Sequence, residues 1–470
     1  MEEYIKKLLE QVRFEKAHKA IGDEIRSHIE EQMEENISEG MDKETAEKAA
    51  VEDMGDPVDA GISLDKVHRP QVAWGVIVTA IVLGVIGIVI NILLEKEILG
   101  SYVQYSSTQL YKVHEYASYI INFLLGIAVM LLFYFIDFTT LAKYSDILAG
   151  ILLITRFATY YVFILSSDLF FANSFEYIPA WYSTIAMFFV HPVLVCSMIP
   201  LFAGILYKYK GQKYSALVKA LIWIIVSYML GAYGYLESTT IIITICMLIE
   251  LSIAIQKEWI KVPKIASIIS VWTLLVVIPA GVTIFMYKNG LFDQTKMAIL
   301  KWTFSRNFEY KKYEDTINAM KLFGSGKINY FDGTVPISTK LYISEMGDIT
   351  FDIAAVWGLA AAFAVIAAVA GLIVLGFVVV SKTKNQLGLV MGSGCLMWLA
   401  MNAIGSICGD FMTLPIIVSG FIPFISSYSV MIVVMPYAFL GIILSIYKYK
   451  NAYPAHVDVS IRRKAKDYVI

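Results

Sequence analysis

Ten long apolar segments run along this chain and constrain its fold more than any other feature. Hydrophobic residues make up 58% of the 470 residues, and charged residues only 17%. A helix needs about 20 consecutive apolar residues to cross a bilayer, and it must satisfy its own backbone hydrogen bonds there. We therefore expect an all-α polytopic membrane protein with about ten transmembrane helices. The segments fall at roughly 72–94, 117–136, 145–165, 183–207, 216–232, 238–255, 265–287, 352–380, 387–408 and 428–447.

Basic residues divide the short connections into two sets. One set contains 15 Lys and Arg residues, and the alternate set contains two, Lys96 and Lys112. Loops rich in Lys and Arg usually stay in the cytoplasm, so the first set and both chain termini are predicted to be cytoplasmic. The first set comprises 137–144, 208–215, 256–264, 382–386 and the stretch 448–470, and the alternate set comprises 95–116, 166–182, 233–237 and 409–427.

A polar insert of 64 residues, 288–351, separates the seventh and eighth apolar segments. Connections of this length are uncommon unless they bind or catalyse. The alternation of the short connections places the insert outside the cell. Its nine Lys and Arg residues do not oppose that placement, because long loops cross the membrane largely regardless of charge.

The amino-terminal region differs from the rest in charge. Residues 1–70 carry 10 Lys and Arg against 19 Asp and Glu, hence −9, whereas residues 71–470 carry 28 against 21, hence +7. Residues 1–62 are predicted to form a small cytoplasmic domain of three helices, which we call the head. A linker at 63–71, a membrane domain at 72–450 and a cytoplasmic tail at 451–470 complete the predicted organisation.

The helices of the head are predicted from an apolar stripe and from stop signals. Gly40 is expected to end one helix and Asp42 to cap the next, which the Gly55-Asp56-Pro57 turn would end. The stripe repeats every four residues on an otherwise charged helix, and a core this thin favours packing on a partner. It consists of Ile21, Ile25, Ile29, Met33 and Ile37.

The cysteines and the basic residues exclude two function classes. The four cysteines all lie in apolar segments without CxxC spacing, so neither a disulfide framework nor a metal site is expected. No basic face with interleaved aromatics stands free of the membrane, so nucleic acid is not an expected partner. No cofactor is evident from these residues. The cysteines are Cys196, Cys246, Cys395 and Cys408.

Two regions resemble known families. ISEGMDKETAEKAAVEDMGDP in the head is similar to the permease-prefix, or HAAS-type, domain that precedes bacterial membrane proteins, which implies a regulatory or protein-contact role. YEDTINAMKLFGSGK (313–327), VPISTKLYISEMGDITFDIAAVWGL (335–359) and NAIGSICGDFMTLPIIVSGFIPFISSYSV (402–430) resemble the SEDS family of FtsW, RodA and SpoVE. The second resemblance extends over about 72–450 and is specific only in about its last 150 residues.

The SEDS resemblance implies a glycosyltransferase of the bacterial plasma membrane. Members polymerise undecaprenyl-diphosphate-linked peptidoglycan precursor, usually beside a class B penicillin-binding protein, in division, elongation or sporulation. The substrate would then be a lipid-linked disaccharide-peptide that enters from the membrane lipid. A divalent cation at the diphosphate is left open.

The chain departs from the family pattern at several positions. Met346 and Gly347 replace the histidine and threonine that precede the family's catalytic aspartate. Ser427, Tyr428 and Ser429 replace the glycines after PFIS, and the fourth segment carries VHPV around His191 where the family has a Gln-Pro-Ser-Glu motif. These departures favour an alternative, a catalytically silent scaffold or regulator of a division or sporulation complex. A lipid flippase is a third reading, although no internal repeat is visible.

The resemblance implies that Asp348 is the general base that accepts a proton from the attacking sugar hydroxyl. An alternative role for Asp348 is an N-cap of the helix that follows. Asp352 lies four residues on, where it would share a helix face with Asp348, and is the second candidate base. An acid in an apolar helix is itself a functional signal.

Five further residues are candidate substrate-binding groups. Lys301 and Arg306 lie in the most basic part of the insert and suit a diphosphate, although an amphipathic face on anionic lipid is the alternative. Glu237 and Asp410 lie at predicted outer helix ends, where they would line one cavity or remain solvated. Arg156 lies within the third apolar segment, which predicts a buried polar role with an unidentified partner.

Overall fold

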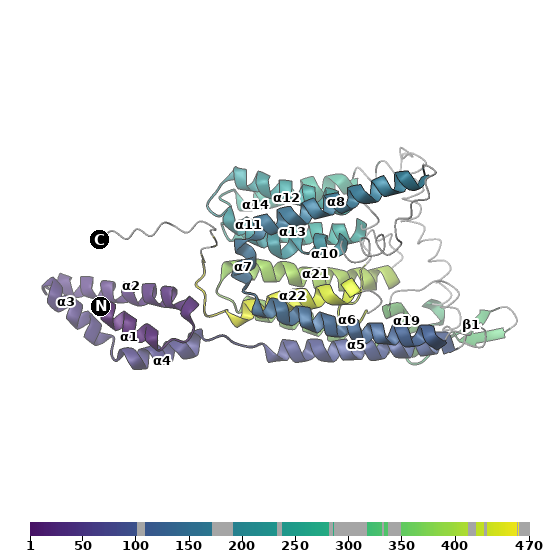
Figure 1. Ribbon diagram of the computed structural model, residues 1–470, viewed down its shortest axis with the longest axis horizontal. Coiled ribbons are helices and arrows are strands. Elements are labelled where there is room, and N and C mark those ends of the chain that lie inside the picture. Colours follow the sequence, from purple (N-terminus) through teal and green to yellow (C-terminus); the bar gives the residue numbers. More distant parts are fainter. Residues whose placement is uncertain are drawn as a thin grey trace.

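The computed structural model describes most of the chain and shows a bundle of apolar helices with a helical head at one end (Figure 1). Some helix-end residues, including Glu237 and Asp410, are described by their backbone only. The description excludes residues 101–108, 172–190, 233–236, 282–284, 286–316, 331–332, 337–348, 412–419, 427–429, 458 and 460–470.

The bundle confirms the all-α polytopic prediction. Six of its helices are long and apolar enough to cross a membrane, by length and composition, and three shorter apolar helices accompany them in the described residues. The helices are α5 (Trp74–Gly100), α6 (Gln109–Phe135), α7 (Phe138–Lys143), α8 (Ser145–Phe171), α10 (His191–Cys196), α11 (Met198–Lys208), α12 (Tyr214–Ala232), α13 (Glu237–Gln256), α14 (Lys264–Trp272), the π-helical turn η2 (Thr273–Val277), α19 (Ile349–Trp357), α20 (Leu359–Ser381), α21 (Gln386–Phe411) and α22 (Val430–Lys448).

Helix α21 lies at the centre of the bundle, where it packs against α11, α13, α20 and α22. Helix α22 packs in turn along α6. Helix α5 lies at the periphery, and its outward face is an apolar stripe that remains exposed, as expected of a surface that faces lipid. That stripe consists of Val78, Val82, Val85 and Val89.

Tyr437 of α22 is buried because two glycines leave space for its ring. A Cβ added at Gly84 of α5 would lie 2.1 Å from the Tyr437 hydroxyl, and one added at Gly126 of α6 would lie 2.6 Å from the ring. The hydroxyl donates a hydrogen bond to the Ala80 carbonyl at 3.3 Å. Small residues thus bring α5, α6 and α22 close together, as in other membrane helix contacts.

The head contains four helices, not the three predicted: α1 (Glu2–Glu10), α2 (Glu15–Ser38), α3 (Lys43–Asp53) and α4 (Pro57–His68). The error arose at Gly55-Asp56-Pro57, which ends α3 and also begins α4. Asp56 caps α4 by accepting a hydrogen bond from the Val58 N–H at 2.7 Å, and Pro57 takes the first helical position. The expected boundary at residue 62 therefore falls inside a helix.

The polar insert contributes a two-stranded antiparallel hairpin of β1 (Lys327–Tyr330) and β2 (Gly333–Pro336), which was not predicted. Gly333 lies opposite Tyr330, and Lys327 opposite Pro336. In Figure 1 this hairpin lies at the opposite end of the bundle from the head. We call the two ends the head side and the hairpin side.

Candidate functional site

The candidate site lies on the hairpin side and begins with helix α19. This helix is much shorter than the single crossing that was predicted in this part of the chain. The expected single crossing at 352–380 is broken at Gly358, which has a φ of +100°. A Cβ there would lie 2.7 Å from the Leu322 carbonyl oxygen. The insert approaches the break closely, because the Leu359 and Ala360 N–H groups donate to the Lys321 and Leu322 carbonyls at 2.9 and 3.0 Å.

Asp352 lies in the first turn of α19 and is 9% exposed. The positive end of the helix dipole favours a carboxylate at this position. The neighbouring Thr350 is fully buried, and α19 packs against both α5 and α21. Asp352 is thus a buried acid at a helix N-terminus, held between two other helices. The Asp348 prediction lies outside the described residues, although Asp348 directly precedes α19.

A polar stripe on α21 lies in the half of the helix nearest the hairpin side. Asn402, Ser406 and Asp410 follow one another at four-residue intervals, so they share one face. Asn402 and Ser406 are buried, and the Asn402 amide donates to the Trp398 carbonyl at 2.9 Å. Asn402 and Ser406 are therefore polar groups inside an apolar bundle. The side chain of Asp410 lies outside the description.

A non-helical segment, 420–426, packs directly on this stripe. A Cβ at Gly420 would lie 2.0 Å from the Asn402 carbonyl oxygen. Asn91 of α5 holds the other end of the segment by donating to the Ile425 carbonyl at 2.8 Å. Phe424 adopts a φ of +68°, a strained conformation for a non-glycine residue. Irregular backbone within an apolar bundle requires such partners.

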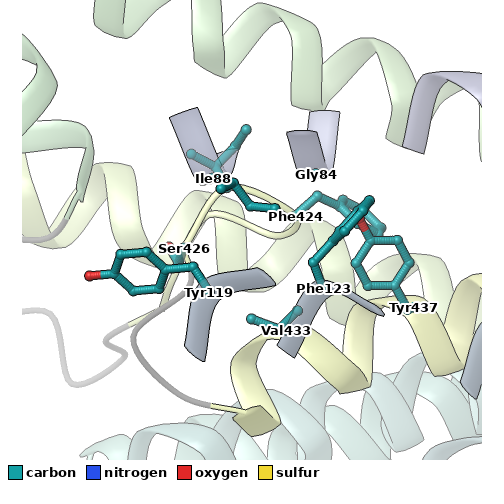
Figure 2. A pocket seen from close by; sticks show the side chains of 9 residues that line it. Gly84, Ile88, Tyr119, Phe123, Phe424, Ser426, Val433 and Tyr437 are labelled. Atoms are coloured by element: carbon teal, nitrogen blue, oxygen red, sulfur yellow. The ribbon is translucent and has the colours of Figure 1, made fainter. Parts of the chain in front are cut away.

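A recess lies between this segment and helices α5, α6 and α22 (Figure 2). It is small and partly open to its surroundings. Three aromatic rings form one wall of the recess. Tyr437 meets Phe123 and Phe424 edge-on, at centroid distances of 6.0 and 5.1 Å. The lining is mainly apolar and suits a hydrocarbon group. It comprises Gly84, Ile88, Tyr119, Phe123, Phe424, Ile425, Ser426, Val433 and Tyr437.

The structure describes Arg156 in full, Glu237 and Asp410 by their backbone only. Arg156 of α8 is 2% exposed, which agrees with its predicted burial. Glu237 is the first residue of α13 and Asp410 is the penultimate residue of α21. Both positions lie on the hairpin side, because the opposite ends of these helices meet through a 2.7 Å hydrogen bond from Trp259 to Gln386. The predictions for Lys301 and Arg306 fall outside the described residues.

Glu250 is a buried acid that the sequence reasoning missed. It is fully buried in α13, and a Cβ added at Gly394 of α21 would lie 1.8 Å from its Oε1. Its carboxyl oxygens have no hydrogen-bond partner within the described part of the chain. Burial without a partner favours the neutral acid, since an isolated carboxylate is far more costly. A single acid within the apolar run 238–255 was the signal available in the sequence.

Metal ligands are not gathered in the described part of the chain, where no group of three or more His, Cys, Asp or Glu side chains could hold a metal ion. The four cysteines are free thiols, and three of them are buried.

Comparison with known proteins finds similar solved structures but no match by sequence. No family model matches the chain, and no curated protein matches it. One similar chain comes from a structure described as the structural coordination of polymerization and crosslinking by a peptidoglycan synthase complex. The two share 12% identity with a TM-score of 0.52, and the match covers 81% of this chain and 99% of the other. At this identity the likeness concerns the fold.

Proposed function

We propose that this chain is a membrane glycosyltransferase of bacterial cell-wall synthesis that polymerises a lipid-diphosphate-linked disaccharide-peptide. The observation that carries the proposal is the likeness of fold to almost the whole of a chain from a peptidoglycan synthase complex. The sequence resemblance of the insert and of 402–430 to SEDS proteins supports the same function independently.

The proposed reaction transfers a glycan onto an acceptor sugar with inversion. The acceptor hydroxyl oxygen bonds to the anomeric carbon of the donor, and the bond from that carbon to the diphosphate breaks. The acceptor proton passes to Asp348 as general base, and the bonding electrons leave with the diphosphate. Lys301 and Arg306 would stabilise the departing charge.

Asp352 is the second candidate base, and its position supports it physically. Its side chain is buried in the first turn of α19, and α19 packs against α21. The α21 stripe and the hairpin-side positions of Glu237 and Asp410 would add polar contacts to the sugar. The recess would hold hydrocarbon from the lipid part of the substrate.

The proposed setting is a bacterial plasma membrane with the hairpin side outside. The similar structure is described as a synthase complex, so we propose a class B penicillin-binding protein as partner. A divalent cation at the diphosphate remains part of the proposal to be tested.

A catalytically silent scaffold is the second candidate function. Met346 and Gly347 stand where the SEDS family has histidine and threonine, and this departure favours it. An acidic head that resembles a protein-contact domain fits the same role. In this case the fold would be retained for assembly, without glycosyl transfer.

Polymerisation by the purified full-length chain distinguishes these functions. We expect wild type to convert lipid-linked disaccharide-peptide into polymer, with and without added Mg²⁺. Asp348→Asn should reduce the rate by about 100-fold or more, as expected for loss of a general base. Asp293→Asn, the same change elsewhere in the insert, is the matched control.

Each outcome assigns a function. Loss of activity in Asp352→Asn but not in Asp348→Asn moves the base to α19. An inactive wild type that still binds the precursor and a penicillin-binding protein contradicts the enzyme and supports the scaffold.

A further inference from the structure

Phe14 joins the core of the head to the core of the membrane bundle. It lies between α1 and α2, and it packs against buried residues of both apolar clusters. Its ring stacks on Tyr449 at a centroid distance of 5.3 Å and an angle of 23°, and it meets Tyr453 edge-on at 6.4 Å. Both tyrosines lie in residues 449–457, which follow α22 and which we call the strap.

Two hydrogen bonds accompany the ring contact. The Gln71 N–H donates to the Lys448 carbonyl at 3.0 Å, and the Asn451 amide donates to the Val67 carbonyl at 3.3 Å. The first bond joins the linker to the last residue of α22, and the second joins α4 of the head to the strap. The head also has its own buried core, formed by residues such as Leu8, Ile21 and Ile29. It can therefore separate from the strap without losing that core.

The strap also binds the head-side ends of three helices of the bundle. The Tyr453 hydroxyl donates to Asp137, which caps α7 by accepting from the Thr139 N–H at 3.0 Å. Burial and the nearby Asp137 raise the pKa of Tyr453, so this hydroxyl remains a donor at neutral pH.

The next residues of the strap reach α21 and α11. The Asn385 amide donates to the Pro454 carbonyl at 2.8 Å, and the Gln386 N–H donates to the Ala455 carbonyl at 3.0 Å. The Val457 N–H donates to the Tyr207 hydroxyl of α11 at 2.9 Å. One short segment thus connects the head with α7, α11 and α21.

We propose that the head docks reversibly on the strap through Phe14, and that docking holds the head-side ends of α7, α11 and α21 in place. Contacts between domains allow relative motion unless they are large and apolar, and here they centre on one ring and two hydrogen bonds. A ligand of the head that displaces Phe14 would therefore act on the bundle through Tyr449 and Tyr453. This regulatory device goes beyond the proposed function and does not depend on it.

Distances between spin labels test the docking in the full chain. Cysteines at the exposed residues Ser63 of the head and Lys213 of the bundle would carry the labels, in a Cys408→Ser background because the other cysteines are buried. We expect one narrow distance distribution for the parent. Phe14→Ala and Tyr449→Leu should each shift the docked-to-undocked ratio by about tenfold and broaden the distribution.

Two controls keep this measurement interpretable. Ile37→Ala changes an exposed apolar residue at the far end of α2 and should leave the distribution narrow. Since Phe14 also packs within the head, the double variant should broaden the distribution no further than either single variant. A broad parent distribution, or one unchanged by both single variants, overturns the docking.

Hydrogen exchange of the same variants tests whether docking of the head holds the head-side ends of the bundle helices in place. Amides of α7 and of residues 385–389 should exchange several-fold faster in Phe14→Ala and Tyr449→Leu than in Ile37→Ala. If the distances broaden while exchange in these regions stays at the parent rate, the head docks but does not hold the helix ends. That result overturns the coupling.

Discussion

A few polar residues are buried among the apolar helices of the bundle, and they are the residues most informative about function. Asp352 was predicted because it lies beside a recognisable motif, whereas Glu250 was missed because no motif surrounds it. Asn402 and Ser406 of the α21 stripe were also missed, although their four-residue spacing from the candidate Asp410 is visible in the sequence. Spacing identifies which residues share a helix face, but only the packing of α19 and the segment 420–426 on α21 shows that this face is internal.

Glu250 should destabilise the bundle, because it is buried without a hydrogen-bond partner among the described residues. Glu250→Met keeps the unbranched shape and removes the polar atoms, so we expect it to raise stability by about 1–3 kcal/mol. Glu250→Ala leaves a cavity, so it should be about 2–5 kcal/mol less stable than Glu250→Met. Thermal unfolding in detergent measures both. A Met variant as unstable as the Ala variant would mean that Glu250 is paired in the membrane.

Asp42 caps α3, as predicted from its position after Gly40. Its carboxylate accepts from the Thr45 N–H at 3.1 Å, and hydrogen bonds to Thr45 lower the pKa of Asp42. Asp42→Ala should therefore speed hydrogen exchange in α3 several-fold at pH 7, whereas Asp53→Ala, at the other end of α3, should not. Because the pKa of Asp42 is lower in the folded head than in the unfolded chain, the ionised carboxylate stabilises the fold above about pH 4. This stabilisation is lost as the pH falls through the pKa of Asp42 in the folded state. The difference between parent and Asp42→Ala should then shrink steadily as the pH is lowered below about 4, after correction for intrinsic exchange.

At the scale of the element, apolar runs predicted the helices well and their interruptions poorly. The run 387–408 corresponds closely to α21, but 352–380 contains the break at Gly358, and 183–207 contains a break between α10 and α11. Hydrophobicity does not show such breaks, because a single Gly358 or Ser197 does not interrupt a long apolar run. The hairpin β1–β2 was missed because the insert was described by polarity alone, although its Asp-Gly pair favours a turn.

The break between α19 and α20 depends on Gly358. A side chain there would be strained at a φ of +100° and would lie 2.7 Å from the Leu322 carbonyl oxygen. We expect Gly358→Ala to lower stability by about 1–3 kcal/mol and to weaken the contact between the insert and α20. Gly371→Ala is the control, because a Cβ there meets nothing within 4 Å. Equal unfolding midpoints for the two variants in detergent would show that the break tolerates a side chain.

On the scale of the whole molecule, the chain separates its polar parts to opposite ends of an apolar bundle. The head and the strap meet on one side, where the Asn451 amide of the strap donates to the Val67 carbonyl of α4. The hairpin and α19 lie towards the other side (Figure 1), and the polar stripe occupies the half of α21 nearest that side. This separation could be predicted from the positions of the polar stretches alone. The side of the membrane that each end faces depends on the distribution of Lys and Arg and stays a prediction.

Cysteine labelling of intact cells tests this orientation. Ser38 in the exposed end of α2 and Ser325 beside the hairpin are replaced singly by cysteine, in a Cys408→Ser background in which the remaining cysteines are buried. The split of 15 against two Lys and Arg residues across the short connections predicts that a membrane-impermeant thiol reagent modifies position 325 and not position 38. Permeabilised cells should label both positions, which controls for local burial of the half-buried Ser325. Labelling of position 38 in intact cells would reverse the orientation, and it would also place the proposed site in the cytoplasm, where Asp348 could not serve an extracellular polymerase.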